Sequence, residues 1–382
     1  MRFLIVGLGS MGKRRARLLR GLEPDCEIFG VDTSEERMDK KGGYRMQERY
    51  SRQILFSGVG EEGQKKIREK HVLIIGAGAL GAANAEAIVR AGVGKVTIAD
   101  RDYVEWSNLQ RQQLYTEEDA KQYKPKAVAA AEHLRAINSE VEITPVVTDV
   151  TVQEMEELVN DVDLILDATD NFETRLLIND ISQKYNLPWI YGGCVGSYGV
   201  TYTILPGKTP CFRCLMEHPA SGATCDTAGI IQPAVQLVVA HQTTEALKIL
   251  VEDYGALRET MLSFDLWNNQ QMAFKVNRQK KDTCLSCGRL RTYPSLTFEA
   301  QTKTEVLCGR NTVQIRPGVR KNFNLEEIKK RLQRSVEIKA TPYLLSFPVE
   351  EYRFVLFTDG RAFIHGTTDI NVAKSLYARY IG

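Results

Sequence analysis

Short apolar runs alternate with amphipathic stretches along the central part of the chain. Four of these runs read as strands, at 71–75, 95–99, 143–147 and 162–167. Helical stretches such as 126–137 lie between them. Strands that alternate with helices favour a parallel sheet covered on both faces. We therefore predict an α/β fold with a Rossmann-like, doubly wound sheet.

The pattern changes beyond the fourth strand. A short strand at 189–191 precedes an alternating stretch at 199–204, which predicts an antiparallel extension of the sheet, and an apolar helix spans about 233–250. After Gly288 the sequence predicts a small α/β appendage without a catalytic constellation. Its expected elements are a strand at 313–317, a helix at 325–332 capped by Asn324, two strands joined at Asp359-Gly360, and a helix after Asp369.

The first 45 residues begin like another nucleotide-binding fold and then stop. An apolar strand at 3–6 precedes a glycine-rich stretch at 7–12 and a second strand at 28–32. No crossover helix and third strand follow, although a dinucleotide site needs them. This piece resembles the truncated start of Gfo/Idh-type NAD(P)-dependent dehydrogenases. We predict that residues 1–45 are a fragment or linker, 46–288 a nucleotide-binding domain, and 289–382 a C-terminal domain.

Four of the eight cysteines form two C-x-x-C pairs: Cys211 with Cys214, and Cys284 with Cys287. This spacing is typical of a tetrahedral zinc site made of four thiolates. Because the protein fills all four positions, the zinc is expected to be structural. It would join the end of the nucleotide-binding domain to its middle.

Composition narrows the class of protein. With 382 residues, 43% of them hydrophobic, and a net charge of +2, the chain suits an ordinary globular protein and argues against nucleic acid as the main partner. No run reaches the roughly 18 apolar residues of a membrane helix. No signal peptide opens the sequence, and the remaining cysteines fit a reducing compartment. We expect a cytoplasmic protein without membrane or nucleic-acid partners.

The glycines of Gly76-x-Gly78-x-x-Gly81 follow the first strand of the central domain, where it turns into a helix. Glycines there let a phosphate approach the helix N-terminus closely. Asp100 ends the next strand, where a carboxylate can bind both ribose hydroxyls. These features alone fit an NAD enzyme equally well.

The segment after Asp100 favours phosphoryl or nucleotidyl transfer. Residues 101–112 supply a polar cluster that includes Arg111, and Lys126 opens a helix nearby. Such donors stabilise charge that develops on phosphates. Asp170 and Asn171 follow the fourth strand, where Mg²⁺ bound to phosphates could lie.

Together the glycine loop, Asp100, the stretch Ser107-Asn108-Leu109-Gln110-Arg111-Gln112, Lys126 after Pro125, Asp170-Asn171 and the cysteine pairs resemble the MoeB/ThiF/HesA family over residues 49–288. These enzymes are related to ubiquitin-activating enzymes. The resemblance implies ATP- and Mg²⁺-dependent adenylation of the C-terminal Gly-Gly end of a ubiquitin-like sulfur-carrier protein. The carrier would serve thiamine or molybdenum-cofactor biosynthesis, and the sequence does not decide between them.

The resemblance also assigns roles by position. Gly76, Gly78 and Gly81 would form the nucleotide loop and Asp100 would hold the ribose. Phosphate contacts would come from Asn108, Arg111, Gln112 and Lys126, whereas Asp170, next to Asn171, would hold Mg²⁺. Arg52 would reach the ATP site of a neighbouring subunit, which implies a homodimer.

Three further expectations concern sulfur transfer and binding of the carrier. Cys225 matches the family position of a cysteine that links covalently to the activated carrier. Arg175, one helical turn past Asp170, is expected to contact phosphate or carrier. Since no rhodanese-like domain follows the second cysteine pair, a separate cysteine desulfurase would supply the sulfur.

Two other functions remain open at this level. An NAD(P)-dependent dehydrogenase is favoured by the two glycine loops, at Gly7 and Gly76, but no substrate-side proton donor is evident. A non-catalytic scaffold that binds a carrier would not need Arg111, Lys126 and Asp170.

Overall fold

The computed structural model describes residues 2–6, 27–31, 43–216, 228–297, 303–307, 311–317, 323–333 and 336–381. The chain forms two units, Met1–Gln64 and Lys65–Gly382. In the first unit, β1 (Arg2–Val6) pairs in parallel with β2 (Glu27–Val31), and α2 (Gly43–Ile54) follows. Helix α3 (Gly60–Glu69) begins in this unit and ends in the second. The glycine-rich stretch at 7–12 lies outside the described residues.

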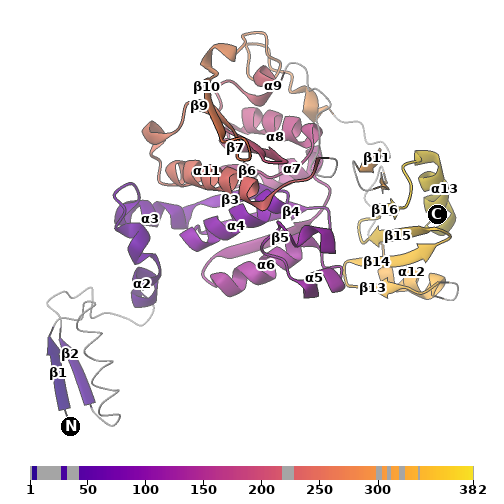
Figure 1. The fold of residues 1–382 in the computed structure, drawn as a ribbon, viewed down its shortest axis with the longest axis horizontal. Helices are drawn as coiled ribbons and strands as arrows, with labels where there is room; N and C mark the ends of the chain where they lie inside the picture. The colour runs from indigo at the N-terminus through magenta and orange to yellow at the C-terminus, as the bar shows by residue number, and fades with distance from the viewer. Residues whose placement is uncertain are drawn as a thin grey trace. The chain divides into compact units, whose positions relative to one another are not determined.

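An eight-stranded sheet organises the second unit, in the order β10-β9-β8-β7-β6-β3-β4-β5 (Figure 1). The neighbouring strands β7, β6, β3, β4 and β5 are parallel, whereas β8, β9 and β10 extend the sheet in antiparallel fashion. This confirms the predicted doubly wound sheet and its extension. The strands are β3 (His71–Ile75), β4 (Lys95–Asp100), β5 (Glu142–Val147), β6 (Leu164–Asp167), β7 (Trp189–Val195), β8 (Tyr198–Ile204), β9 (Thr260–Asp265) and β10 (Gln270–Lys275).

Helices cover both faces of this sheet. Helices α4, α6 and α11 lie on one face, where α4 and α11 are side by side, and α7 and α8 lie on the other (Figure 1). The helices are α4 (Ala79–Ala91), α5 (Glu117–Lys121), α6 (Lys126–Ile137), α7 (Val152–Leu158), α8 (Phe172–Tyr185), α9 (Phe212–Leu215) and α11 (Gln232–Leu250), with short 3-10 turns at Trp106–Asn108, Tyr254–Ala256, Asn277–Gln279 and Pro294–Leu296.

The core explains why the central strands read as continuous apolar runs. All five residues of β3 are buried, because helices pack on both faces of a parallel strand. Under α7 and α8 the core contains Ile165, Ile178 and Trp189. Under α4 and α11 a smaller cluster contains Leu80 and Val238.

A second sheet forms the C-terminal part, in the antiparallel order β11-β12-β16-β15-β14-β13. Gly360, with a φ of +84°, makes the turn between β15 and β16, as its sequence predicted. Asn324 and Asp369 cap the two helices of this sheet through their side chains. The elements are β11 (Lys303–Leu307), β12 (Thr312–Arg316), α12 (Leu325–Leu332), β13 (Lys339–Ala340), β14 (Leu344–Val349), β15 (Tyr352–Phe357), β16 (Ala362–His365) and α13 (Ile370–Tyr380).

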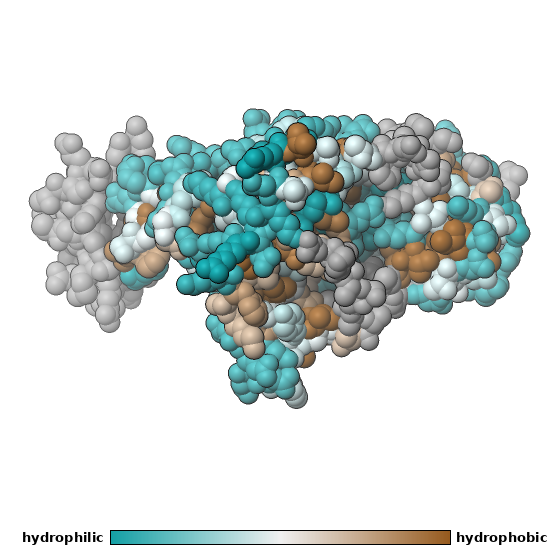
Figure 2. Space-filling view, turned by 90° about the horizontal axis from the view of Figure 1, so that it is seen from above, coloured by the Kyte–Doolittle hydropathy of each residue, from teal (hydrophilic) through white to brown (hydrophobic). Residues whose placement is uncertain are grey.

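Several large apolar side chains are exposed on the described part of the chain. Figure 2 shows one face of the molecule, where hydrophilic residues predominate among those described and apolar residues form small separate groups. Trp267 and Leu290 are among the most exposed apolar residues. In the described ranges, no helix combines the length and apolar character needed to cross a bilayer.

Candidate active site and metal centre

The glycine-rich loop between β3 and α4 leaves room for a ligand. Gly76 has a φ of +93°, which glycine adopts without strain. A Cβ atom on Gly76 would lie 2.5 Å from the carbonyl oxygen of Ala168, and one on Gly81 would lie 1.8 Å from that of Gly76. At Gly78 a Cβ would meet nothing within 4 Å among the described residues beyond its chain neighbours. The open space lies at the N-terminus of α4, where backbone N–H groups attract phosphate.

Asp100 ends β4 and lies beside this loop. Its Oδ2 accepts a 2.6 Å hydrogen bond from the N–H of Ala77, and its Oδ1 accepts one of 2.6 Å from the N–H of Asp102. Burial raises the pKa of the Asp100 carboxyl, and the Lys126 ammonium opposes that change. The two hydrogen bonds fix the carboxylate where doubly wound folds place the acidic residue that binds a ribose.

Buried polar side chains from the following segment adjoin Asp100. Lys126, which begins α6, is 3% exposed, and its Nζ donates to Oδ2 of Asp102 at 3.1 Å. Asn108 and Gln112 are also buried, and Oδ1 of Asn108 accepts from the N–H of Glu105 at 3.0 Å. Oε1 of Gln112 has no hydrogen-bond partner in the part of the chain that the structure describes. A buried acceptor of this kind marks a position that a ligand or water completes.

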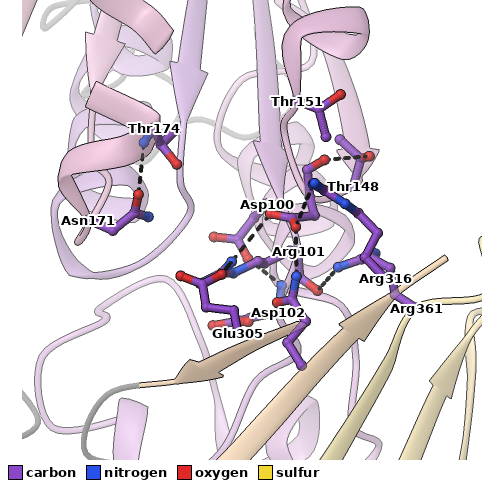
Figure 3. Close-up of polar contacts among 12 residues, drawn as sticks. Asp100, Arg101, Asp102, Thr148, Thr151, Asn171, Thr174, Glu305, Arg316 and Arg361 are labelled. Atoms are coloured by element: carbon purple, nitrogen blue, oxygen red, sulfur yellow. Dashed lines mark hydrogen bonds and ion pairs between the residues drawn. The ribbon is translucent and has the colours of Figure 1, made fainter. Parts of the chain in front are cut away.

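Two charged groups of the expected site are more accessible. Arg111 is partly exposed, and its Nη1 donates to the carbonyl oxygen of Ser107 at 2.9 Å. Asp170 is exposed, and its Oδ1 lies 3.5 Å from Nδ2 of Asn171. Asn171 caps α8, since its Oδ1 accepts from the N–H of Thr174 at 2.8 Å (Figure 3). Asp170 therefore lies at a helix N-terminus at the carboxyl end of the sheet.

Arg175 is buried rather than presented to a phosphate or carrier. Its Nε donates to Oδ2 of the fully buried Asp167 at 3.1 Å. Its Nη2 donates to the carbonyl oxygens of Thr169 at 2.5 Å and Gly192 at 3.3 Å. The guanidinium thus holds the loop that carries Asp170. Arg175 therefore positions this loop instead of making the expected contact with phosphate or carrier.

The four paired cysteines meet at one buried point. Their Sγ atoms all lie within 4.8 Å of one another. The separations are 3.8 Å for Cys211–Cys214, 3.6 Å for Cys211–Cys284 and 3.4 Å for Cys214–Cys287. A tetrahedral zinc ion with Zn–S bonds of about 2.3 Å has S···S edges of roughly 3.8 Å. The four sulfurs therefore fit such an ion.

The cysteine cluster is anchored to α8 through Asp180, which is fully buried. Its Oδ2 accepts from Nη2 of Arg213 at 3.2 Å and from the N–H of Ser295 at 2.8 Å. Its Oδ1 accepts from the hydroxyl of Ser286 and from Nδ2 of Asn179. Arg213 lies in the first cysteine pair and Ser286 in the second, so one carboxylate ties both pairs to the helix that begins near Asp170.

Comparison with known families decides between the nucleotide-binding classes that this geometry allows. The ThiF family model matches residues 50–286, which contain the glycine loop, the polar cluster and nearly all of the cysteine cluster. The chain belongs to the ThiF family.

Relatives of this ThiF-family chain include named adenylyltransferases. It is 54% identical over 336 residues to the sulfur carrier protein ThiS adenylyltransferase of Bacillus subtilis, covering 87% of this chain and 99% of that protein. It is 37% identical over 242 residues to the Escherichia coli protein of the same name, and 34% identical over 244 residues to the E. coli molybdopterin-synthase adenylyltransferase. These alignments each cover 63% of this chain, and 94% and 96% of those proteins.

Solved structures support the fold. E. coli MccB crystallised with ATP superposes with a TM-score of 0.55 at 20% identity, over 65% of this chain and 80% of that chain. SeMet PaaA superposes with a TM-score of 0.53 at 22% identity, over 70% of this chain and 83% of that chain. At these identities the likeness concerns the fold alone.

Two predicted residues of this ThiF-family chain, Arg52 and Cys225, do not belong to the site described above. Arg52 is on α2, in the first unit, and Cys225 lies outside the described residues. The sequence reasoning missed Asp102, the partner of Lys126, although its place two residues after Asp100 could have indicated it. It also missed Asp180, for which no local motif exists.

Proposed function

We propose that the protein uses ATP to adenylate the C-terminal glycine of a ubiquitin-like sulfur-carrier protein and releases pyrophosphate. The main support is that the Gly76–Gly81 loop and Asp170 follow β3 and β6, two neighbouring parallel strands at which the strand order reverses. Doubly wound sheets bind nucleotides at such a switch point. The printed names of the relatives supply the reaction.

In this reaction the terminal carboxylate of the carrier attacks the α-phosphorus of ATP. A bond forms between a carboxylate oxygen and phosphorus, and the bond to the bridging oxygen breaks, so that pyrophosphate leaves with its electron pair. The attacking carboxylate is already ionised at neutral pH, so no general base is required. The protein therefore works by positioning the reactants and neutralising charge.

Each predicted residue has a place in this scheme. The phosphates rest on the N-terminus of α4, beside the open space at Gly78, and Asp100 accepts from the ribose hydroxyls. Lys126 carries three N–H donors and is fixed by Asp102, which leaves donors for a phosphate. Arg111 adds a planar set of donors. The remaining polar contacts to phosphate come from Asn108 and Gln112, and Asn171 adjoins the nucleotide beside Asp170.

Two metal ions complete the proposal. Asp170 would hold Mg²⁺, which favours one or two carboxylates together with phosphate oxygens and lowers the cost of charge on departing pyrophosphate. Zn²⁺ would be held by the four cysteines and would have no open coordination position. Its role is to keep the two cysteine pairs and α8 together.

The partners follow from the family resemblance. Arg52 of a second copy would complete the ATP site, so the protein would act as a homodimer. Cys225 would link covalently to the activated carrier, and a separate cysteine desulfurase would deliver sulfur. We place the protein in the cytoplasm. The extent of identity to the B. subtilis protein favours a ThiS-like carrier and thiamine biosynthesis over a MoaD-like carrier and the molybdenum cofactor.

The test is ATP–pyrophosphate exchange with the purified protein, Mg²⁺ and one Gly-Gly-ending carrier at a time. We expect exchange with a ThiS-like carrier and little with a MoaD-like carrier. Exchange with none, while ATP still binds, would favour a non-catalytic carrier-binding scaffold. Binding of NAD(P)H in place of ATP would favour an NAD(P)-dependent dehydrogenase.

A further inference from the structure

The C-terminal sheet packs directly on the segment that follows Asp100. The carbonyl oxygen of Arg101 accepts from Nη1 of Arg361 at 3.1 Å. The hydroxyl of Tyr103 lies 3.0 Å from Nε2 of His365 and accepts from Nη2 of Arg353 at 3.1 Å. The ring of Tyr103 belongs to an apolar cluster whose other buried members all come from the C-terminal sheet: Leu307, Leu344, Val355, Phe357 and Phe363.

Asp149, which follows β5, forms a second junction. Its Oδ1 accepts from Nη1 of Arg101 at 3.3 Å. Its Oδ2 accepts from Nε2 of Gln314 at 2.6 Å and from Nη1 of Arg316 at 3.1 Å, and both of these donors lie on β12. Burial raises the pKa of the Asp149 carboxyl, but the guanidinium groups around it bring the pKa below its ordinary value. Asp149 thus carries a negative charge that joins the two sheets.

A cavity of about 190 Å³ lies at these junctions. Residues that follow three parallel strands line it: Arg101 after β4, Asp149 after the neighbouring β5, and Asn171 after β6, which β3 separates from β4. The C-terminal sheet contributes Glu305 and Arg316, and Figure 3 shows Arg101 between these two side chains. Apolar lining comes from Val150, Val152, Leu176, Leu177 and Pro294, and the remaining lining residues are polar: Thr151, Glu173, Thr174, Ser295 and Thr297.

The residues that line this cavity follow β4, β5 and β6, at the edge of the sheet where a doubly wound fold binds a nucleotide. Phosphates at the N-terminus of α4 and a ribose at Asp100 direct the base away from the glycine loop, past the ends of β4 and β5. The cavity is smaller than the roughly 300–1,000 Å³ of pockets that hold a whole drug-sized ligand, so it suits one end of a nucleotide. Its apolar side chains can cover the faces of a purine, and Asn171 can bond to its edge.

We propose that the C-terminal domain forms the outer wall of the ATP pocket at the purine, through Glu305 and Arg316. Arg316 is a positioning residue, because it acts through Asp149 on the Arg101 segment that continues from Asp100. Affinity for ATP, rather than turnover of bound ATP, then depends on a domain that carries none of the phosphate-binding groups. This inference rests on the proposed use of ATP and adds a role for residues 303–381.

The test compares two ligands that share the triphosphate: ATP, which also carries the ribose and the base, and inorganic tripolyphosphate, which lacks both. Isothermal titration calorimetry on the full chain, with Mg²⁺ and without carrier, gives both dissociation constants. We expect Arg316→Ala to raise the dissociation constant of ATP about tenfold. The dissociation constant of tripolyphosphate should stay within twofold of the wild-type value. Arg316→Lys, which keeps the charge facing Asp149, should recover part of the loss. Arg379→Ala is the control, since this exposed arginine of the same domain pairs with Glu350.

Two results would overturn the proposal. If Arg316→Ala binds ATP as tightly as the wild type does, the C-terminal domain does not form part of the pocket. If its affinities for ATP and tripolyphosphate fall equally, the domain acts on the phosphates instead. If Arg316→Ala fails to fold, Glu305→Gln provides the same comparison, because its side chain is 32% exposed and its substitution by an isosteric amide is mild. Both ligands bind without a carrier, so failure of the adenylation assay would leave this test intact.

Discussion

Asp180 offers the sharpest test of how the cysteine cluster is held. Its side chain is fully buried and accepts from Arg213, Ser286, Ser295 and Asn179. Asp180→Ala would remove the carboxylate and leave the guanidinium of Arg213 without it. Breaking a buried ion pair by removing one partner costs about 3–5 kcal/mol. At about 2–4 °C per kcal/mol for a domain of this size, the melting temperature should fall by roughly 6–20 °C.

A matched control lies in the same region. Asp282 pairs with Arg289 at 2.8 Å, but the two side chains are 76% and 83% exposed. An exposed pair contributes only about 0–1 kcal/mol, so Asp282→Ala should melt close to wild type.

The assay is thermal unfolding followed by circular dichroism, with bound zinc measured by atomic absorption before and after dialysis. We expect Asp180→Ala to melt earlier and to lose zinc during dialysis, because both cysteine pairs are tied to α8 through this carboxylate. Equal melting temperatures and zinc contents for Asp180→Ala and Asp282→Ala would refute the reasoning.

Three other predictions concern Lys126, Cys284 and His71. Lys126→Ala should lower the rate of ATP–pyrophosphate exchange by about 10²- to 10³-fold, because a fixed donor to the phosphates is lost. Lys121→Ala, at an exposed lysine, should leave the rate unchanged, and similar rates for the two variants would exclude the proposed role. Cys284→Ser should lose zinc and unfold at lower temperature, and retained zinc would show that this thiolate is no ligand. Burial lowers the pKa of His71 below 6.5, so the unfolded state binds the proton more readily and stability should fall as pH drops through about 6.5. Urea unfolding at several pH values should show a smaller decline in His71→Gln.

Local patterns were enough to predict the central domain. Buried parallel strands read as short apolar runs, and Gly76, Gly78 and Gly81 appear where strand geometry requires a turn into a helix. The cysteine cluster was predictable because the ligands of one ion come from two C-x-x-C pairs, whatever the distance between them in sequence. In each case, residues that are close together in the sequence form the pattern that the structure requires.

The parts that the sequence did not reveal depend on contacts between distant segments. Asp149 and Arg316 meet although each lies in an unremarkable stretch, and neither carries a motif. Arg175 was expected to contact phosphate or carrier because it lies one helical turn past Asp170, but its guanidinium pairs with the buried Asp167. Pairings of this kind depend on how the strands and helices pack, which periodicity does not encode.

The most direct test of adenylyl transfer is the intact mass of the carrier after a short incubation with the protein, ATP and Mg²⁺, with rapid acid quenching. The account predicts a ThiS-like carrier that gains one adenylyl group, and no gain for the same carrier without its terminal glycine. An unchanged mass with every Gly-Gly-ending carrier, from protein that binds ATP, would contradict the proposed reaction.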